Sequence, residues 1–585
     1  MAEGPRRILF AGLVALVGLL FAHSGRLVAA EGLAAEQAAL QPAAFNHVGI
    51  YDLKAAEPGL TGAGVRIGAV CRSFTYIDGL PQNDYRPGTG HDCLNAKEFV
   101  FHDYADGAAG VSPHSTAICS ILFGRDDGGF NPAVGGFRYE GIVPEAEADI
   151  YEFWHFLIEH VYHGAPPEAD IITVSIGDQF EHWWTRGIES MVEQFGVIVV
   201  GGIGNGSNVH DPLLYPGAGA NVIGVGVVDT SNSKNLAKAL ANLALAYPEH
   251  SSFGPTSDGR CKPDIVAPGN CLAAETSEPN RYEPTGNWSS YSTPIVSGTL
   301  GLLVQKANAD ANLAPAVSPA GGSCVMKALL MNSATKLPYW HKGRLEAEDD
   351  HEAPLDHIQG AGMLNAAGAY RHLVAGINGP GEVPATGWDL NQVDNGENGG
   401  KVYRFSVEEP AGKLIAVTAV WNRHYEGFYP FRGQPDKDTD IRLELWAVDA
   451  NNGGNSYLLD YSDSPVDNVE HIYHRADANY TNYEVVISCS DAEDANQPGK
   501  TERYGLAWDV RSVSAKADNI LQYDLNADGI VDEADVVVFI ENSLASISPG
   551  YRYALGDINS DGAIDYEDLK ILMENIDRQA EWRSD

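Results

Sequence analysis

The chain has 585 residues, which is enough for three or four domains. Its 38 Lys and Arg residues face 79 Asp and Glu residues, so the formal net charge is −41. An acidic excess of this size argues against nucleic-acid binding and indicates a well-hydrated surface. The seven cysteines are an odd number, so at least one is not paired within the chain, although Cys261 and Cys271 are close enough in sequence to form a disulfide.

Residues 1–30 have the pattern of a secretory signal peptide. Arg6 and Arg7 precede an apolar run over residues 8–22, and small residues at 28–30 provide a cleavage site after Ala30. An uncleaved membrane anchor is the alternative, although the run is short for a bilayer span and no later segment is apolar enough to cross one. We therefore expect a secreted protein, outside the cell or in a cell-surface assembly, with a short segment at 31–45 before the first domain.

Residues 46–376 alternate between strand and helix patterns. Apolar runs punctuated by glycine predict buried strands at 62–70, 169–177, 197–201 and 221–228. Helical patterns begin at His114 and cover residues 184–195. This alternation predicts an α/β domain with a doubly wound, mostly parallel sheet and a functional site at the carboxyl ends of its strands.

A serine at the start of a buried helix lies near the end of this domain. Ser290 precedes Pro294 and the apolar run 295–304. At such a position the serine oxygen lies beside unpaired backbone N–H groups and the positive end of the helix dipole, which favours developing negative charge. Serine is also a common helix cap, so the position alone does not identify a nucleophile.

The surrounding segments resemble the subtilisin-like serine peptidases. Residues 251–269 (SSFGPTSDGRCKPDIVAPG), followed by the block around Ser290, resemble the family segment that leads to its nucleophilic serine. The resemblance implies that Ser290 is the nucleophile. Residues 114–120 (HSTAICS) resemble the family's HGTxVAG, which implies that His114 is the general base. Residues 199–207 (VVGGIGNGS) resemble VVAAGNxG, which implies that the Asn205 side chain donates to the oxyanion.

The family resemblance also extends to a substrate-binding strand. Residues 170–177 (DIITVSIG) resemble the strand along which the family binds its polypeptide substrate. By this resemblance Ser175, Ile176 and Gly177 pair with an extended peptide by strand addition.

One departure concerns the catalytic aspartate, which the family places at the end of its first buried strand. Here residues 67–74 read IGAVCRSF, and two alignments put Cys71 or Arg72 in that column. Neither is a carboxylate that orients and stabilises an imidazolium. Asp78, Asp84 and Asp92 are alternatives, although loop acids of this kind are usually solvent-exposed. Segment 31–45 is also too short for the folding-assistant prodomain of many secreted relatives.

Residues 377–512 have the pattern of a second, all-β domain. Alternating apolar and polar residues predict strands at 401–407, 413–421, 440–446 and 482–488. Short strands separated by Asn, Gly and Asp turns predict an antiparallel β-sandwich. The segment resembles the jelly-roll domains that follow peptidase domains in many secreted proteases.

Two twelve-residue loops in residues 513–585 predict calcium sites. Residues 524–535 (DLNADGIVDEAD) and 557–568 (DINSDGAIDYED) place oxygen-bearing side chains at positions one, three, five, nine and twelve, with Gly at six and a backbone carbonyl at seven. The predicted Ca²⁺ ligands are Asp524, Asn526, Asp528, Ile530, Asp532, Asp535, Asp557, Asn559, Asp561, Ala563, Asp565 and Asp568. Each loop precedes an apolar-faced helix, at 536–544 and 569–576.

Two loop–helix units of this kind resemble a type I dockerin, which docks onto cohesin domains of scaffold or surface proteins. We therefore expect a secreted serine endopeptidase that hydrolyses peptide bonds through an acyl-enzyme and is held on a cohesin-bearing scaffold. The alternative is an inactive peptidase-like binding or assembly protein, associated with peptide or polysaccharide and localised by its dockerin.

Overall fold

The fold was analysed in a computed structural model of the chain. It describes residues 39–73, 76–77, 80–81, 83–104, 109–206, 212–230, 236–241, 243–246, 251–337, 340–343, 351–394, 400–449, 456–489, 500–512, 523, 525, 530–542, 558 and 564–578. The predicted signal peptide at 1–30 lies outside these residues, as do most of the predicted calcium ligands.

A mostly parallel sheet forms the centre of the first domain. Its strand order is β14-β13-β12-β11-β2-β10-β6, with β15 also paired to β13. Only the β13–β14 pair is antiparallel. The strands are β2 (Arg66–Cys71), β6 (Val100–His102), β10 (Glu147–Glu152), β11 (Ile171–Val174), β12 (Ile198–Gly202), β13 (Ile223–Thr230), β14 (Leu243–Ala246) and β15 (Ile265–Pro268). The prediction of a parallel sheet is confirmed.

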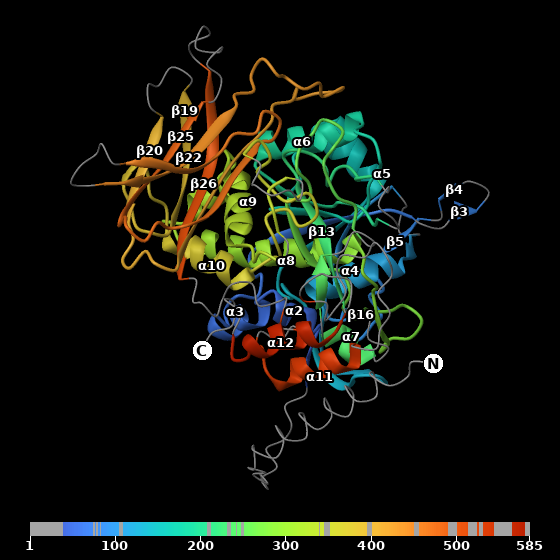
Figure 1. Cartoon of the computed structure of the whole chain (residues 1–585). Helices are drawn as coiled ribbons and strands as arrows, with labels where there is room; N and C mark the ends of the chain where they lie inside the picture. The colour runs from blue at the N-terminus through green and yellow to red at the C-terminus, as the bar shows by residue number, and fades with distance from the viewer. Residues whose placement is uncertain are drawn as a thin grey trace, which may run out of the picture. The chain divides into compact units, whose positions relative to one another are not determined.

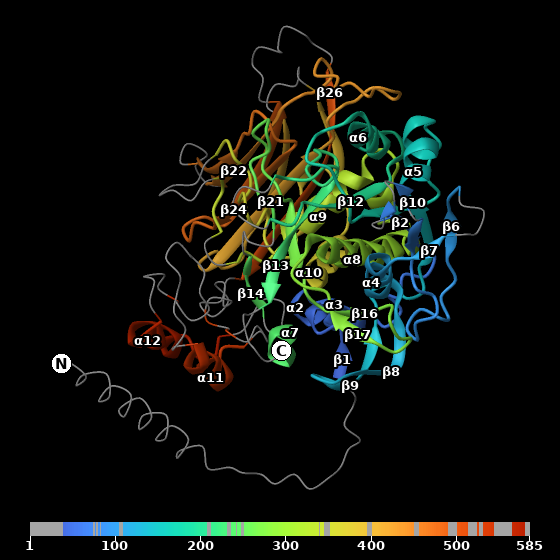
Figure 2. The same cartoon turned by 90° about the vertical axis from the view of Figure 1, so that its right-hand side faces the viewer.

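Alternate residues of each central strand point to opposite faces of this sheet. In β2, Ile67 and Ala69 belong to one hydrophobic core, whereas Val70 belongs to another. In the same way, β11 contributes Ile171 to the first core and Ile172 to the second. Both faces are covered by helices, with α4 (Pro113–Phe123) and α8 (Ser289–Ala309) on one side and α5 (Phe153–Phe156) and α6 (Trp183–Phe195) on the other (Figure 2).

Shorter elements complete this domain. The other helices are α2 (Ala44–His47), α3 (Ile50–Ala56), the π-helix η1 (Leu157–Tyr162), α7 (Leu236–Ala241), the 3₁₀ helix η2 (Ala314–Val317), α9 (Gly322–Ser333) and α10 (Ala366–Ala375). The peripheral strands are β1 (Ala39–Gln41), β3 (Tyr76–Ile77), β4 (Leu80–Pro81), β5 (Asp84–Arg86), β7 (Gly110–Val111), β8 (Arg125–Asn131), β9 (Gly135–Glu140), β16 (Leu272–Ala274) and β17 (Tyr282–Pro284).

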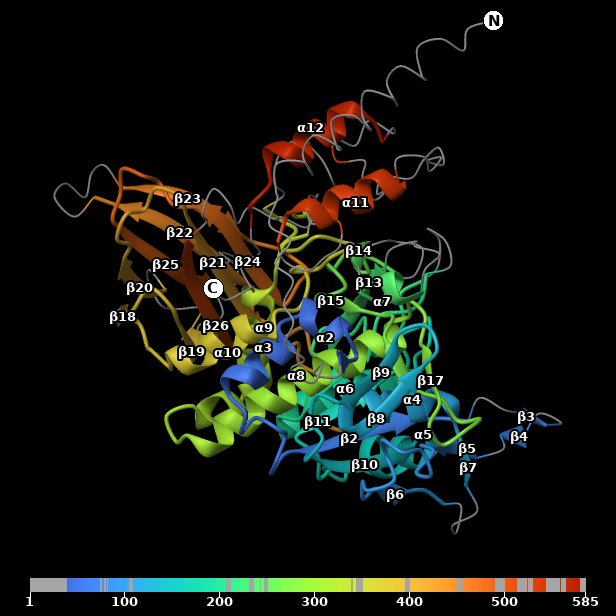
Figure 3. The same cartoon turned by 90° about the horizontal axis from the view of Figure 1, so that it is seen from below.

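Two antiparallel sheets follow in residues 381–512. One has the order β18-β20-β25-β22-β23 and the other β19-β26-β21-β24. Their strands are β18 (Gly381–Glu382), β19 (Gly387–Asp394), β20 (Lys401–Ser406), β21 (Lys413–Trp421), β22 (Ile441–Val448), β23 (Tyr457–Ser462), β24 (Val469–Arg475), β25 (Asn482–Cys489) and β26 (Thr501–Ser512). Figure 3 shows the sheets facing one another, and residues from both, such as Phe405 and Val417, share one buried core.

Helices α9 and α10 join the first domain to these sheets. They pack on β21, β26 and β19 of the four-stranded sheet (Figure 1). A buried ion cluster lies at the inner side of α9: the carboxylate of Asp264 accepts from Lys262 Nζ at 2.6 Å and from the backbone N–H of Gly224 at 2.6 Å. Its other oxygen lies 2.9 Å from Lys327 Nζ on α9. Burial acts to raise the pKa of Asp264, but the two lysines outweigh it and hold the pKa below its ordinary value.

His424 also links the first domain to the four-stranded sheet. Its Nδ1 lies 2.6 Å from a carboxylate oxygen of Glu193 on α6, and its Nε2 lies 3.1 Å from that of Glu502 on β26. Burial disfavours the imidazolium, but hydrogen bonds to the two carboxylates raise the pKa of His424 to about 10. A charged side chain therefore stabilises the contact between the two parts of the chain.

The described C-terminal residues include two helices, α11 (Glu533–Asn542) and α12 (Tyr566–Glu574). They overlap the helices predicted at 536–544 and 569–576. None of the helices in the described ranges is long and apolar enough to cross a bilayer. All seven cysteines are described and all are free thiols, so the pairing of Cys261 with Cys271 is not formed. Cys261 Sγ instead lies 3.5 Å from the carbonyl oxygen of Leu355.

Candidate active site

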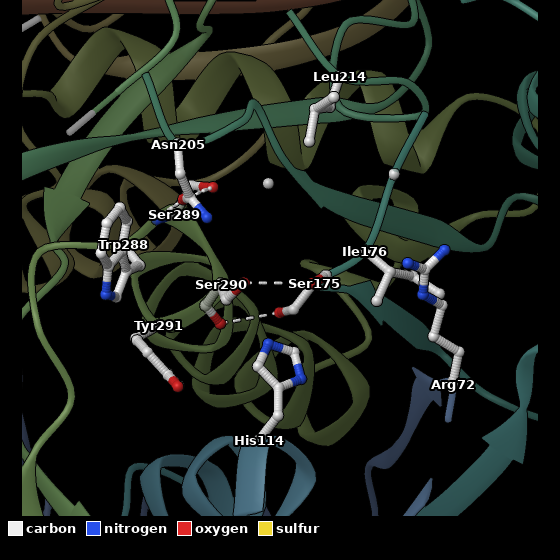
Figure 4. Close-up of a pocket in the computed structure, with 12 residues that line it drawn as sticks. Arg72, His114, Ser175, Ile176, Asn205, Leu214, Trp288, Ser289, Ser290 and Tyr291 are labelled. Atoms are coloured by element: carbon white, nitrogen blue, oxygen red, sulfur yellow. Dashed lines mark hydrogen bonds between the residues drawn. The ribbon is translucent and has the colours of Figure 1, made fainter. Parts of the chain in front are cut away.

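Ser290 lies in the first turn of α8. A proline one turn later leaves the carbonyl of Ser290 without its helical hydrogen bond. Pro294 has no N–H, so it cannot donate the helical hydrogen bond to the carbonyl of Ser290. The hydroxyl of Ser175, directly after β11, donates to that carbonyl at 2.9 Å instead. In return, Ser290 Oγ donates to the carbonyl of Ser175 at 3.3 Å. These two bonds hold the predicted nucleophile against the end of the predicted substrate-binding strand (Figure 4).

Asn205 is held in place by the residue before the predicted nucleophile. Its Oδ1 accepts from both the backbone N–H and the hydroxyl of Ser289, each at 2.8 Å. Because both bonds use the carbonyl oxygen, the amide Nδ2 is left turned toward the cavity, as Figure 4 shows. Gly204 precedes it with φ +117°, and a Cβ there would lie 2.6 Å from Ser252 Oγ, so only glycine fits. The donor predicted from the sequence therefore faces Ser290.

His114 is the second residue of α4, which begins at an N-cap where Ser112 Oγ accepts from the N–H of Ser115 at 3.3 Å. The helix places the imidazole in the same cavity as Ser290, with its ring centroid 5.8 Å from that of Tyr291. Burial and then the positive charge of Arg72 lower the pKa of His114 to about 4. The imidazole is therefore neutral at pH 7 and is a weaker base than an ordinary histidine.

The end of β2 places one of the two alternative residues in the cavity. Neighbouring residues of a strand point to opposite faces, and Cys71 is buried in the core with Ile67 and Ala69. Burial raises the pKa of the Cys71 thiol to about 11. Arg72 instead lines the cavity and lies beside Ile176 in Figure 4.

The cavity that contains these groups has a volume of about 380 Å³. It is lined by Arg72, His114, Ser175, Ile176, Gly177, Gly202, Asn205, Leu214, Trp288, Ser289, Ser290 and Tyr291. All six residues predicted for catalysis and substrate binding are in this set. Within the described part of the chain, no Asp or Glu lines the cavity.

The alternative aspartates lie elsewhere where they are described. Asp84 carries an Oδ1 that accepts from the hydroxyl of Ser73, and it does not line the cavity. Asp92 is exposed, with its N–H bonded to the carbonyl of Pro279 at 2.7 Å. Asp78 lies outside the described residues.

Tertiary structure adds residues that sequence patterns did not assign to the site. Ser289 and Trp288 adjoin Ser290 in sequence, so their proximity to it alone was a signal. Leu214 had no such signal, because only the fold brings it to Gly177, where a Cβ would lie 2.9 Å from Leu214 Cβ.

The predicted calcium loops are described only in part. Of their ligands, the structure describes Ile530, Asp532, Asp535, Asp565 and Asp568. Asp535 and Asp568, both at loop position twelve, are 0% exposed. Each accepts from the backbone N–H at loop position nine, Asp535 from Asp532 at 2.8 Å and Asp568 from Asp565 at 2.9 Å.

In the second loop this contact is part of a capping box at the start of α12, with Asp565 as the N-cap residue. Within the described residues, no group of three or more His, Cys, Asp or Glu side chains is arranged to hold a metal ion.

The middle of the chain is similar to a known protein family. Residues 92–362, less than half of the chain, match the subtilase family (Peptidase_S8). Serine protease AprX of Bacillus subtilis (strain 168) is 27% identical over 203 residues, which are 29% of this chain and 44% of AprX. C5a peptidase of Streptococcus pyogenes is 34% identical over 116 residues, 20% of this chain and 9% of that protein. Pyrolysin of Pyrococcus furiosus is 26% identical over 176 residues, 26% of this chain and 12% of that protein. The chain spans less than half the length of each of these relatives.

Proposed function

We propose that the chain is a serine endopeptidase of the subtilisin type, and the match of residues 92–362 to the subtilase family supports this proposal. The observation that supports this most strongly is the shared cavity of Ser290, His114 and Asn205. Four separate sequence segments, 114–120, 170–177, 199–207 and the block around Ser290, converge on that cavity. The proposed reaction is hydrolysis of a peptide bond through an acyl-enzyme.

The chemistry follows from the roles of the three side chains. Ser290 Oγ forms a bond to the carbonyl carbon of the peptide while its proton passes to the imidazole of His114. The carbonyl oxygen becomes an oxyanion, which the Asn205 amide Nδ2 stabilises by donating a hydrogen bond. The C–N bond then breaks as the imidazole returns the proton to the leaving amine. Water, deprotonated by the same imidazole, hydrolyses the acyl ester and releases Ser290.

The hydrogen bond that Ser290 makes without substrate indicates what must change when a peptide binds. Ser290 Oγ donates to the carbonyl of Ser175 at 3.3 Å. Pairing of that strand with a peptide engages the same carbonyl and releases the hydroxyl toward His114. Catalytic hydrogen bonds are often loose without substrate and tighten in the complex.

A second proposal is an inactive peptidase-like protein that binds peptide or polysaccharide. It is favoured by Arg72 at the place proposed for the orienting aspartate, because a nearby cation disfavours imidazolium. The lowered pKa of His114 agrees with a site in which the imidazolium is disfavoured. We favour the active enzyme because Ser290, Asn205 and the segment 175–177 after β11 have an arrangement suited to acyl transfer.

Labelling with a fluorophosphonate probe separates the two functions. The probe reacts with an activated serine, so wild-type protein should label and Ser290→Ala should not. Ser292→Ala is the matched control, because Ser292 lies in the same helix but its hydroxyl donates to the carbonyl of Ser289 at 3.1 Å. Absence of labelling in folded wild-type protein would refute the active-enzyme proposal. Labelling that persists in Ser290→Ala would refute the assignment of the nucleophile.

We also propose that residues 513–585 are a calcium-dependent dockerin that attaches the enzyme to a cohesin-bearing scaffold outside the cell, and that residues 377–512 are a jelly-roll-like β-sandwich. The repeated contact between loop positions nine and twelve, Asp532–Asp535 and Asp565–Asp568, supports the loop duplication. Titration of the chelator-treated full chain with Ca²⁺ should reveal two high-affinity sites. Loss of one site in Asp535→Ala and of the other in Asp568→Ala tests the assignment.

A further inference from the structure

A group of aromatic side chains is exposed beside α5, η1 and α6. Trp154, Ile158 and Tyr162 follow one another at intervals of four residues along α5 and η1, so they lie on one side of these helices, and all three are exposed. Exposed apolar patches of this kind mark sites of interaction with other molecules. We define the aromatic surface as Trp154, Tyr162, Phe180, Trp183, Phe428 and Tyr429, of which Trp183 is half-buried and the others are exposed.

Three of these rings, from segments far apart in the chain, pack against one another. The ring centroid of Tyr162 lies 6.1 Å from that of Trp183 and 5.7 Å from that of Tyr429, and the last two are 5.6 Å apart. Their planes are tilted against each other by 80°, 60° and 69°, so the three rings do not form one flat platform. Tilted rings suit further aromatic side chains, which prefer edge-to-face neighbours.

The part of the chain that forms the two antiparallel sheets supplies Phe428 and Tyr429 through a loop that is fixed to α6. On α6, Arg186 Nε donates to the carbonyl of Phe431 at 3.1 Å, and Ser190 Oγ donates to the carbonyl of Glu426 at 3.0 Å. The Phe431 side chain is 3% exposed and belongs to the core beneath α6. Bonds on both sides of Phe428 and Tyr429 hold this loop in place, so little conformational entropy is lost when a ligand binds there.

The aromatic surface begins at the edge of the sheet that carries the cavity. Strands β11, β2 and β10 are parallel neighbours, so the residues that follow them lie along one edge. Trp154 comes two residues after β10, about 10 Å from the end of β11 at a strand spacing of about 4.8 Å. Ile176, which lines the cavity, belongs to the core against which Trp183 packs. Phe180 is three residues beyond Gly177.

We propose that the aromatic surface binds a second segment of the polypeptide substrate, one that carries aromatic or aliphatic side chains, while another segment occupies the cavity. The inference rests on the proposed peptidase function, to which it adds a substrate class: polypeptides with an apolar segment at some distance from the cleaved bond.

Charge and shape favour this occupant over other polymers and over lipid. Glu159 and Glu181 lie in the segments that carry Tyr162 and Phe180, and the net charge of the chain is −41. Nucleic acids and anionic lipid surfaces are therefore repelled. The tilt between the rings of Tyr162, Trp183 and Tyr429 does not suit a flat molecule that must stack on several rings at once. Apolar side chains of a polypeptide carry no charge and fit rings of any orientation.

Peptide binding to the full-length Ser290→Ala protein tests the proposal without requiring catalysis. The probes are capped Gly/Ser-rich peptides with a central alanine-leucine hexapeptide for the cavity. A Phe-Leu-Tyr block stands three, six or nine residues before or after the hexapeptide, because nine extended residues reach about 30 Å. Matched peptides carry Ser-Gly-Ser at the same place. Isothermal titration calorimetry should show, at one spacing, about tenfold to a hundredfold tighter binding of the Phe-Leu-Tyr peptide, the gain expected for burying two or three apolar side chains after the cost of ordering them.

Variants in the Ser290→Ala background identify the origin of this preference. The double change Phe428→Ser and Tyr429→Ser should abolish it, and Tyr162→Ser should reduce it. These side chains are exposed, so the melting temperature should stay close to that of the parent. Tyr457→Ser is the matched control, because Tyr457 is an exposed tyrosine on β23 outside the aromatic surface, and it should leave the preference intact.

Several results would overturn the proposal. They are equal affinity for both kinds of peptide at every spacing, no binding by any peptide, a preference that survives the double change, and an equal loss in Tyr457→Ser. Binding of dextran or of phosphatidylcholine vesicles that the double change removes, in place of peptide binding, would show a different occupant and would also overturn it.

Fluorophosphonate labelling separates this inference from the proposed function. If wild-type protein labels but Ser290→Ala shows no preference for the Phe-Leu-Tyr peptides, the inference fails and the peptidase proposal stands. If Ser290→Ala prefers these peptides through Tyr429 but folded wild-type protein neither labels nor cleaves, the binding surface stands and the peptidase proposal fails.

Discussion

Replacement of Arg72 by Asp is expected to convert a weak base into an effective one. The change removes a cation that shares the cavity with His114 and lowers its pKa, and it places a carboxylate there. The carboxylate stabilises the imidazolium that forms as Ser290 attacks. We therefore predict a higher kcat/KM for a neutral peptide.

The magnitude follows from the pKa of His114. Burial and Arg72 hold this pKa at about 4, against an ordinary value of about 6.5. Restoring the ordinary value corresponds to about 3 kcal/mol in favour of the imidazolium. Burial is the larger cause of the lowered pKa and remains after the substitution, so the new carboxylate must offset burial as well; if the transition state then gains all of this free energy, the rate rises by roughly 300-fold. An upper bound is the loss on removing the acid in subtilisin, about 3 × 10⁴ in turnover.

The assay is kcat/KM for a Gln-containing peptide across the pH range, with wild-type, Arg72→Asp and two controls. Cys71→Asp tests the other alignment and should lower the melting temperature without raising the rate, because Cys71 is 2% exposed and its replacement buries a carboxylate in the core. Arg404→Asp applies the same charge change at a half-exposed site on β20, outside the cavity. The expected pH profile of Arg72→Asp has its acidic limb shifted to higher pH than in wild-type protein, because the pKa of the base rises.

A folded Arg72→Asp protein with unchanged kcat/KM and an unchanged acidic limb would refute the reasoning. That result would mean that Arg72 does not control the imidazole. A rate gain of similar size in Arg404→Asp would also refute it, because the effect would then come from net charge.

Three further predictions concern stability and metal. Asp264→Asn should lower the free energy of unfolding in denaturant titrations by about 3–5 kcal/mol, since it leaves the amines of Lys262 and Lys327 buried without a carboxylate, whereas Asp127→Asn on exposed β8 should have little effect. Because the pKa of His424 is raised in the folded protein to about 10, its contribution is fully present below pH 6.5 and is lost as the pH rises through 10. Wild-type stability should therefore fall over this window relative to His424→Gln, and parallel curves for the two proteins would contradict the assignment. Chelation of calcium should abolish cohesin binding and increase proteolysis of residues 513–585 while fluorophosphonate labelling persists; unchanged cohesin binding would exclude a calcium-dependent dockerin.

The local sequence was sufficient for much of the first domain. Glycine-punctuated apolar runs predicted strands β2, β11, β12 and β13, because a parallel strand buried on both faces needs apolar side chains throughout. The start of α4 at His114 and of α8 near Ser290 was also visible in the pattern. The parallel sheet that these elements form is the predicted one.

Contacts between distant segments could not be deduced from such patterns. Two alignments left Cys71 and Arg72 equivalent, and only the pleat of β2 within the assembled sheet separates them. Sequence patterns also could not show that Leu214 lines the cavity. Cys261 and Cys271 are close in sequence but remain free thiols, because sequence spacing does not determine the direction of a side chain.

The sequence by itself determined which chemical groups are available: a serine at a helix start, a histidine, an asparagine and a buried strand. Tertiary structure decided which groups meet, because a sheet joins strands that are far apart in the chain and alternate residues of each strand face opposite sides. It placed Arg72 in the cavity with His114 and turned Cys71 into the core. The electrostatic environment of the base depends on that arrangement, since charge acts through distance in space rather than along the chain.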